Sequence, residues 1–252
     1  MNSFIYGYKI NEFKLTKKKY SVIVMSIVNW YETMPAKFLD IPTPNPNKEL
    51  HGFDIPFRLC CVAPSGSGKS NWITNLISLF SQGKGTFSQV IIICKDKEEP
   101  LYRFLASKSD QIQVKEGLQN LPNLDTFDKE MASLVVIDDC QNDRDQEKVK
   151  NFYIRCRKKN ISIAYLGQNY YVIPKVVRAN CNYLVLLKLS GDRELNMILK
   201  ENGLGVDKTQ LLNLYKYATD TKFSPLIVNI ESTDDEKKFR KGFTEYLDPN
   251  DF

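Results

Sequence analysis

The sequence predicts an α/β fold, in which a mainly parallel β-sheet carries helices on both faces. Six short apolar runs rich in β-branched residues recur along the chain, and stretches of helix length separate them. This alternation indicates strands that are joined by helical crossovers. Nearly every position in the runs is apolar, which is typical of strands covered on both faces. The expected strands are residues 57–62, 89–94, 134–138, 161–167, 182–189 and 225–230.

Three stretches between these strands have the apolar spacing of amphipathic helices. The first, residues 69–82, directly follows a glycine-rich loop. The second, residues 144–160, is charged on one side. In the third, residues 192–203, we expect Asp192 to be the N-cap and Gly203 to stop the helix, since these residue types are common at helix ends.

The predicted organisation has four segments. Residues 1–24 form a basic extension that we expect to be dispensable, because the sequence from Met25 onward reads as a plausible protein start. Residues 25–52 are expected to be an extended, proline-rich arm and linker on the surface of the domain. The core spans residues 53–232, and residues 233–252 form a charged tail.

Composition excludes several classes of protein. Residues 1–24 carry +4 of the net charge of +5, so overall charge is no argument for nucleic-acid binding. The longest uncharged apolar run, residues 20–31, has 12 residues against the roughly 20 needed to cross a bilayer, and no signal cleavage site follows it. The six cysteines contain no C-x-x-C pair and indicate reduced, buried thiols. The single histidine, His51, is expected in a loop.

The segment APSGSGKS, residues 63–70, matches the phosphate-binding pattern [A/G]-x-x-x-x-G-K-[S/T]. It follows a predicted strand and precedes a predicted helix, which is the context that this loop requires. The glycines let backbone N–H groups wrap an anion. We expect Lys69 to reach the β- and γ-phosphates and Ser70 to bind Mg²⁺. The expected ATP-binding residues are Pro64, Ser65, Gly66, Ser67, Gly68, Lys69, Ser70 and Asn71.

Two carboxylates end the buried run SLVVIDD. A strand that delivers Asp138 and Asp139 at its carboxyl end places them at the rim where such sheets bind ligands. We expect Asp138 to hold Mg²⁺ and Asp139 to polarise the attacking water. A second acid beside the metal-binding acid favours hydrolysis over transfer to another acceptor. The alternative is that the two acids only cap the next helix.

Further candidates for catalysis are one glutamine and a group of arginines. Gln168 follows the strand at residues 161–167, where an amide can sense the γ-phosphate. Arg155 and Arg157 close the preceding helix, and either guanidinium could stabilise the transition state in a neighbouring subunit. The alternative for both is a solvated basic helix end. Arg178 is a weaker candidate for the same role.

In their order and content, three segments resemble the FtsK–HerA superfamily of P-loop ATPases. They are FRLCCVAPSGSGKS (57–70), LVVIDD (134–139) and RCRKKNISIAYLGQNYYVIPKVVRANCNYLVLLK (155–188). Within the superfamily, the chain most resembles the DNA-packaging ATPases of poxviruses, other large eukaryotic DNA viruses and virophages, and its small size is virophage-like. The resemblance extends over residues 34–230. It implies a P-loop NTPase of the additional-strand, RecA-like type.

The resemblance also implies what the protein does. It implies an ATPase motor that works as a ring of five or six copies and threads double-stranded DNA into a preformed capsid. The capsid or its portal vertex is then a partner, and the place of action is the host cell cytoplasm or the virion, not the secreted space. The chain departs from the family at Asp139, where glutamate is common, and at Lys158, where viral relatives often have histidine. The alternatives are another FtsK–HerA-type pump or helicase, and a nucleotide-switched assembly protein.

Candidates for DNA contact lie in two of the predicted loops. Lys95 and Lys97 follow the second strand, whereas Tyr170, Tyr171 and Lys175 follow the fourth. Lysine and tyrosine side chains are common partners of phosphates and sugars. The alternative for the two tyrosines is that they pack the loop.

Overall fold

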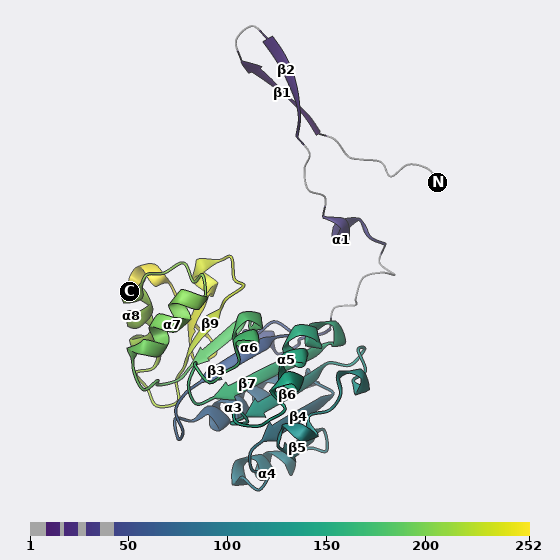
Figure 1. The fold of residues 1–252 in the computed structure, drawn as a ribbon, viewed down its shortest axis with the longest axis vertical. Helices are drawn as coiled ribbons and strands as arrows, with labels where there is room; N and C mark the ends of the chain where they lie inside the picture. The colour runs from purple at the N-terminus through teal and green to yellow at the C-terminus, as the bar shows by residue number, and fades with distance from the viewer. Residues whose placement is uncertain (1–8, 16–17, 25–28, 36–42) are drawn as a thin grey trace. The chain divides into compact units, whose positions relative to one another are not determined.

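The computed structural model describes residues 9–15, 18–24, 29–35 and 43–252. These residues fall into two units, one within residues 1–42 and one that spans Thr43–Phe252. In the first unit, β1 (Lys9–Leu15) and β2 (Lys18–Val24) form an antiparallel hairpin, and α1 (Trp30–Thr33) is a single helical turn (Figure 1). That residues 1–24 are dispensable stays a prediction, and Met25 lies outside the described residues.

The second unit, Thr43–Phe252, is built on a nine-stranded sheet of order β11-β10-β9-β8-β3-β7-β6-β4-β5. The six neighbouring strands from β8 to β5 run parallel, and the other three are antiparallel to their neighbours. The predicted mainly parallel sheet is therefore confirmed. The strands are β3 (Arg58–Val62), β4 (Gln89–Cys94), β5 (Ile112–Glu116), β6 (Ser133–Asp138), β7 (Ile161–Gly167), β8 (Tyr183–Leu186), β9 (Leu226–Asn229), β10 (Phe239–Lys241) and β11 (Glu245–Leu247).

Helices cover both faces of this sheet, as predicted. Alternate side chains of β3 point into two separate hydrophobic cores: Leu59 packs with α3 and α4, whereas Cys60 packs with α5 to α8. Figure 1 shows α5 and α6 in front of the strands. The helices are α2 (Lys48–His51), α3 (Lys69–Phe80), α4 (Pro100–Ala106), α5 (Gln146–Arg155), α6 (Lys175–Asn180), α7 (Asp192–Glu201) and α8 (Lys208–Ala218). No helix among the described residues is long and apolar enough to cross a membrane.

The order of the strands brings the predicted motifs to one edge of the sheet. β7 lies between β3 and β6. It is the extra strand that defines the predicted additional-strand type. Because these three strands are parallel, the residues that follow them emerge at the same edge. There the backbone N–H of Ala63 donates to the carbonyl of Gly167 at 3.1 Å, and that of Asp139 to the carbonyl of Leu166 at 3.2 Å.

The predicted helices are present, but some of their ends differ. The second predicted helix, residues 144–160, corresponds to α5, which is followed by a 3₁₀ turn over Cys156–Lys159. Gly191, not Asp192, is the N-cap of α7, because its backbone is extended (φ 175°, ψ 171°) and the helical conformation starts one residue later. The same helix ends at Glu201, two residues before Gly203.

The end of the chain is not a tail, which corrects the expectation for residues 233–252. β10 pairs with β9, and β11 pairs with β10, so the sheet continues through this segment. Phe239 and Leu247 are buried in the same core as α5. These strands are three residues long and half polar, so they leave no apolar run that a sequence pattern could detect.

The linker before β3 is also more ordered than expected. It contains the helical turn α2, and His51 at its end is buried, not in an exposed loop. The imidazole centroid lies 3.8 Å from that of Phe80, and Nδ1 accepts from the backbone N–H of Phe53 at 3.0 Å. Burial and the nearby Arg240 charge lower the pKa of His51 to about 4. The imidazole is therefore neutral at neutral pH and packs as part of the core.

Candidate nucleotide-binding site

The loop between β3 and α3 has the backbone of an anion-binding loop. Gly66 (φ +75°) and Gly68 (φ +96°) adopt the left-handed conformation that glycine tolerates best. A Cβ atom on Gly68 would lie 2.4 Å from Cδ1 of Phe223, so a side chain at this position would clash. Since α3 begins at Lys69, its unpaired N–H groups and the positive end of its dipole face the loop. This arrangement favours a phosphate group.

Lys69 is held inside the loop. Its side chain is 5% exposed, and Nζ donates to the carbonyl oxygens of Ala63 at 3.0 Å and Pro64 at 3.4 Å. The same Nζ lies 3.8 Å from Oδ1 of Asp139. A buried ammonium needs such partners, and phosphate oxygens would be stronger ones than carbonyl oxygens.

The carboxylate of Asp138 is buried between two hydroxyl groups. Ser70 Oγ donates to Oδ2 at 2.8 Å, and the hydroxyl of Tyr102 on α4 donates to the same oxygen. Burial raises the pKa of Asp138, and the hydrogen bonds from Tyr102 and Ser70 counteract that shift. The other oxygen, Oδ1, is buried and has no hydrogen-bond partner among the described residues. A serine hydroxyl beside an unsatisfied carboxylate oxygen is a donor set that fits Mg²⁺.

Asp139 and Gln168 complete the polar end of the site. Asp139 adopts a left-handed backbone (φ +53°), and its side chain, which is 31% exposed, lies beside Lys69 of the loop. Gln168 Nε2 donates to Oδ2 of Asp139 at 3.4 Å. The structure therefore brings Lys69, Asp139 and Gln168 together, although they are far apart in the sequence.

A cleft of about 670 Å³ runs along these groups, and we call it the phosphate cleft. Ser65, Lys69, Ser70, Asp138 and Asp139 all line it. Its volume lies within the range that is common for small-molecule sites.

Sequence reasoning did not assign several polar and aromatic residues to this site. Asp96, Glu99 and Phe223 line the cleft, and Tyr102 holds Asp138 from the side. Burial, together with repulsion from Asp138 and other acids, raises the pKa of Glu99. The rule that ligands bind at the carboxyl ends of parallel strands would have pointed to Asp96 and Glu99, which follow β4. No sequence pattern pointed to Tyr102 or Phe223.

Arg155 and Arg157 precede the amino end of β7, whereas the phosphate-binding loop lies at the carboxyl ends of the strands. Both precede β7, whose far end is next to the loop, and seven residues of strand span roughly 20 Å. Both side chains are exposed, and neither forms an ion pair within the part of the chain that the structure describes. Neither arginine can therefore reach the phosphate cleft of its own subunit.

Arg178 has a structural role, which corrects its candidacy for catalysis. Its Nε and Nη2 donate to the two carboxylate oxygens of Glu201 at 2.8 and 2.9 Å. Its Nη1 donates to the carbonyl oxygens of Tyr170 and Ile173, and its guanidinium lies over the ring of Tyr170. Tyr170 is buried and packs the loop, so it is not available for DNA contact, whereas Tyr171 is exposed.

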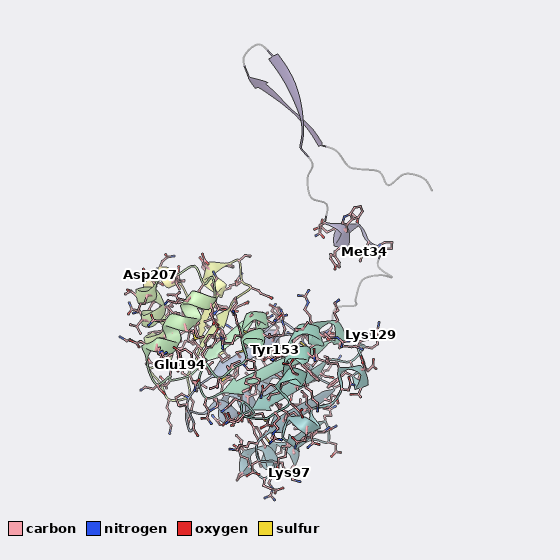
Figure 2. The ribbon with its side chains drawn as sticks, viewed as in Figure 1. Met34, Lys97, Lys129, Tyr153, Glu194 and Asp207 are labelled. Carbon is pink, nitrogen blue, oxygen red and sulfur yellow. The ribbon has the colours of Figure 1, made fainter. Side chains whose placement is uncertain are left out.

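The other candidates for DNA contact lie at the surface. Lys95, Lys97 and Lys175 are exposed, and they follow the carboxyl ends of β4 and β7 along the chain. Lys95 also lines that cleft. Figure 2 shows Lys97 at the outer rim of the domain, whereas Tyr153 lies over the sheet and donates its hydroxyl to the Leu59 carbonyl at 2.6 Å.

Solved structures with a similar fold include viral packaging enzymes. The genome packaging NTPase B204 from Sulfolobus turreted icosahedral virus 2, in complex with AMP, has a TM-score of 0.54 and 14% identity over 75% of this chain and 98% of that chain. The DNA-packaging ATPase B204 from Sulfolobus turreted icosahedral virus has a TM-score of 0.53 and 15% identity over 79% and 98%. ATPases 2 and 3 of EssC from Geobacillus thermodenitrificans have a TM-score of 0.52 and 9% identity over 77% and 40%. At these identities, the likeness establishes a shared fold.

The family is shown by sequence. A comparison with curated protein sequences yields no significant match. The family model described as Poxvirus A32 protein matches residues 49–238, a range that contains the phosphate-binding loop, both aspartates and Gln168. This match confirms the resemblance to poxvirus-type packaging ATPases. The chain belongs to the Poxvirus A32 protein family.

Proposed function

We propose that the protein is an ATP-hydrolysing motor that packages double-stranded viral DNA as a homo-oligomeric ring. The observation that carries the proposal is the convergence of Lys69, Ser70, Asp138, Asp139 and Gln168 at one sheet edge. Family membership and the fold shared with two B204 proteins support it. One of them is described as a DNA-packaging ATPase, and the other, described as a genome packaging NTPase, was solved with ATP-gammaS. The host cytoplasm or the virion as the place of action, and the capsid or portal vertex as a partner, belong to the same proposal.

The residues of the cleft divide the work of hydrolysis. The loop N–H groups and Lys69 bind the phosphates of ATP. Ser70 and Asp138 would hold Mg²⁺, whose charge would offset the negative charge of the phosphates. Asp139 accepts the proton of the water that attacks the γ-phosphorus, and Gln168 helps to orient that water. The bond between the γ-phosphorus and the β–γ bridging oxygen breaks, ADP and phosphate leave, and Asp139 gives its proton to the products or to solvent.

Lys69 connects the loop to Asp139. Its ammonium lies 3.8 Å from Oδ1 of Asp139. Bound phosphate groups would compete for the same ammonium, because they offer it stronger partners.

The remaining charge comes from a neighbouring copy. Arg155 and Arg157 are both exposed and lie about 20 Å from the loop of their own subunit. One of them would enter the cleft of the next subunit. Hydrolysis then depends on ring assembly.

Two alternative functions make different demands. A nucleotide-switched assembly protein would need neither the trans arginine nor DNA, and another FtsK–HerA-type pump would act on DNA outside packaging.

The first test is the steady-state ATPase rate with and without double-stranded DNA over a series of protein concentrations. We expect a DNA-stimulated rate that rises cooperatively with protein concentration, and a loss of about 10³-fold or more in either Arg155→Ala or Arg157→Ala. Arg103→Ala, at an exposed arginine on α4, is the matched control and should keep the wild-type rate. A rate that is indifferent to DNA and to concentration would contradict the motor.

We expect Tyr102→Phe to weaken Mg²⁺ binding without preventing folding. The change removes the hydroxyl that fixes Oδ2 of Asp138, and loss of such a supporting hydrogen bond costs about 10- to 100-fold in metal affinity or activity. The measurement is the ATPase rate over a Mg²⁺ titration, in which half-saturation should move to higher concentration. Tyr217→Phe, which loses an exposed bond to Glu245, is the control. An unchanged Mg²⁺ titration would show that Tyr102 only packs α4.

A further inference from the structure

Phe223 is an exposed aromatic residue that the fold holds against the phosphate-binding loop. Its backbone is left-handed (φ +69°), which is a rare and costly conformation for a bulky residue. Its ring packs directly on Gly68 and is 42% exposed. An exposed ring contributes little to a hydrophobic core, so burial does not account for this conformation.

Phe223 stands where two hollows meet. One is the phosphate cleft, which it lines together with Asn71. The other, which we call the outer hollow, has a volume of about 280 Å³ and is also lined by Asn71 and Phe223. The outer hollow has mostly apolar walls, with Trp72, Pro225 and Phe243 among them. Because Asn71 and Phe223 line both, the phosphate cleft and the apolar outer hollow adjoin at these two residues.

The direction of a bound nucleotide follows from the chemistry of the cleft. The γ-phosphate lies toward Lys69 and the two aspartates, because the lysine reaches the β- and γ-phosphates. The α-phosphate then lies toward the first N–H groups of α3, next to Asn71. The sugar and the base must leave the cleft on that side, where the outer hollow begins.

We infer that the outer hollow is the nucleobase subsite and that Phe223 is the residue on which the base stacks; this rests on the proposed function, in which the loop binds ATP. A flat apolar ring beside an apolar recess is the surface that a purine prefers, and stacking on aromatic side chains is tolerant of the base. The left-handed backbone of Phe223 accompanies a ring that packs on Gly68, where the phosphate cleft and the outer hollow adjoin. Stacking therefore adds affinity that the phosphates alone do not provide.

A third hollow also borders Phe223 and is less suited to the base. It is lined by Gly66 at the tip of the loop and by polar residues such as Thr219, Asp220 and Thr221. It does not include Asn71, which marks the α-phosphate end of the loop.

The test compares a nucleotide with a ligand that has the phosphates but no base. Isothermal titration calorimetry with Mg²⁺ present would measure the binding of ATP and of tripolyphosphate to the wild type, Phe223→Ala, Phe223→Gly and Phe223→Tyr. Glycine suits the left-handed backbone, so that variant keeps the fold while it removes the ring. Phe104→Ala is the matched control, because Phe104 is also exposed (58%) and also lies beside a lysine.

We expect the alanine and glycine variants to bind ATP about 5- to 150-fold more weakly, with tripolyphosphate binding unchanged. Phe223→Tyr and Phe104→Ala should bind both ligands like the wild type. An equal loss for ATP and tripolyphosphate would overturn the inference, since the ring would then only support the loop. Unchanged ATP binding in both ring-deleting variants would overturn it too, although the proposed function would stand. A wild type that binds neither ligand would overturn the proposed function itself, and the inference with it.

Discussion

Replacing Lys69 with methionine is expected to lower the ATPase rate by about 100- to 1000-fold or more. Its ammonium is the buried cation between the loop and Asp139, and methionine keeps the aliphatic stem while it removes the charge. Without this charge, the β- and γ-phosphates lose their partner in the ground state and in the transition state. The rate constant at saturating ATP and the ATP dissociation constant should be measured separately, because the charge acts on both.

Two comparisons make this result specific. Lys95→Met removes an exposed lysine from the rim of the same cleft and should change the rate much less. Asp139→Asn, combined with Lys69→Met, forms a double-mutant cycle. If the lysine and the carboxylate act as one unit, the double variant will be little slower than either single variant. A Lys69→Met protein that keeps its fold and turns over within tenfold of the wild type would remove the loop from the catalytic machinery.

Replacing Arg240 with alanine is expected to destabilise the domain by about 3–5 kcal/mol. The side chain is 1% exposed, and Nη1 donates to the carbonyl oxygens of His51 and Phe243, both at 2.8 Å. The guanidinium also lies over the rings of Phe53 and Tyr246. Alanine would leave a cavity and two carbonyl groups without donors, one of them buried and the other partly buried. Each of these effects costs about several tenths to a few kcal/mol. The measurement is the free energy of unfolding from urea denaturation.

Arg240→Met separates the cost of the cavity from the cost of the lost hydrogen bonds. Methionine fills most of the space but donates no hydrogen bond, and it also removes a buried charge whose Nη2 has no partner in the described part of the chain. We therefore expect about half of the loss seen with alanine. Arg193→Ala is the matched control, because Arg193 also lies over an aromatic ring, that of Tyr171, but at the surface. A loss below 1 kcal/mol for Arg240→Ala would contradict the view that this residue joins the linker to the end of the sheet.

The parallel core of the fold was predictable because its signals are local. Strands buried on both faces must be apolar at nearly every position, as in β6, where all six residues are buried. The loop was predictable for a related reason. Wrapping an anion requires glycine at positions with positive φ, and Gly66 and Gly68 occupy such positions.

The outermost strands of the sheet were not predictable, since side chains in such strands are only partly buried. β5, with the sequence IQVKE, is half exposed, and β10 and β11 are three residues long. The candidate site also has features that the sequence predicted and features that it did not. Its loop and its two aspartates follow from the sequence, whereas Tyr102 is part of the site only because α4 packs where its hydroxyl meets Asp138.

The sequence by itself determined the α/β class, the phosphate-binding loop and the acids that follow a buried strand, because each depends on residues that are neighbours along the chain. Only the tertiary structure decided that Arg178 pairs with Glu201, that Arg155 and Arg157 lie at the far edge, and that Phe223 covers Gly68. The physical reason is distance along the chain. Contacts such as that between Arg240 and the carbonyl of His51, 189 positions apart, exist only when the whole sheet has assembled.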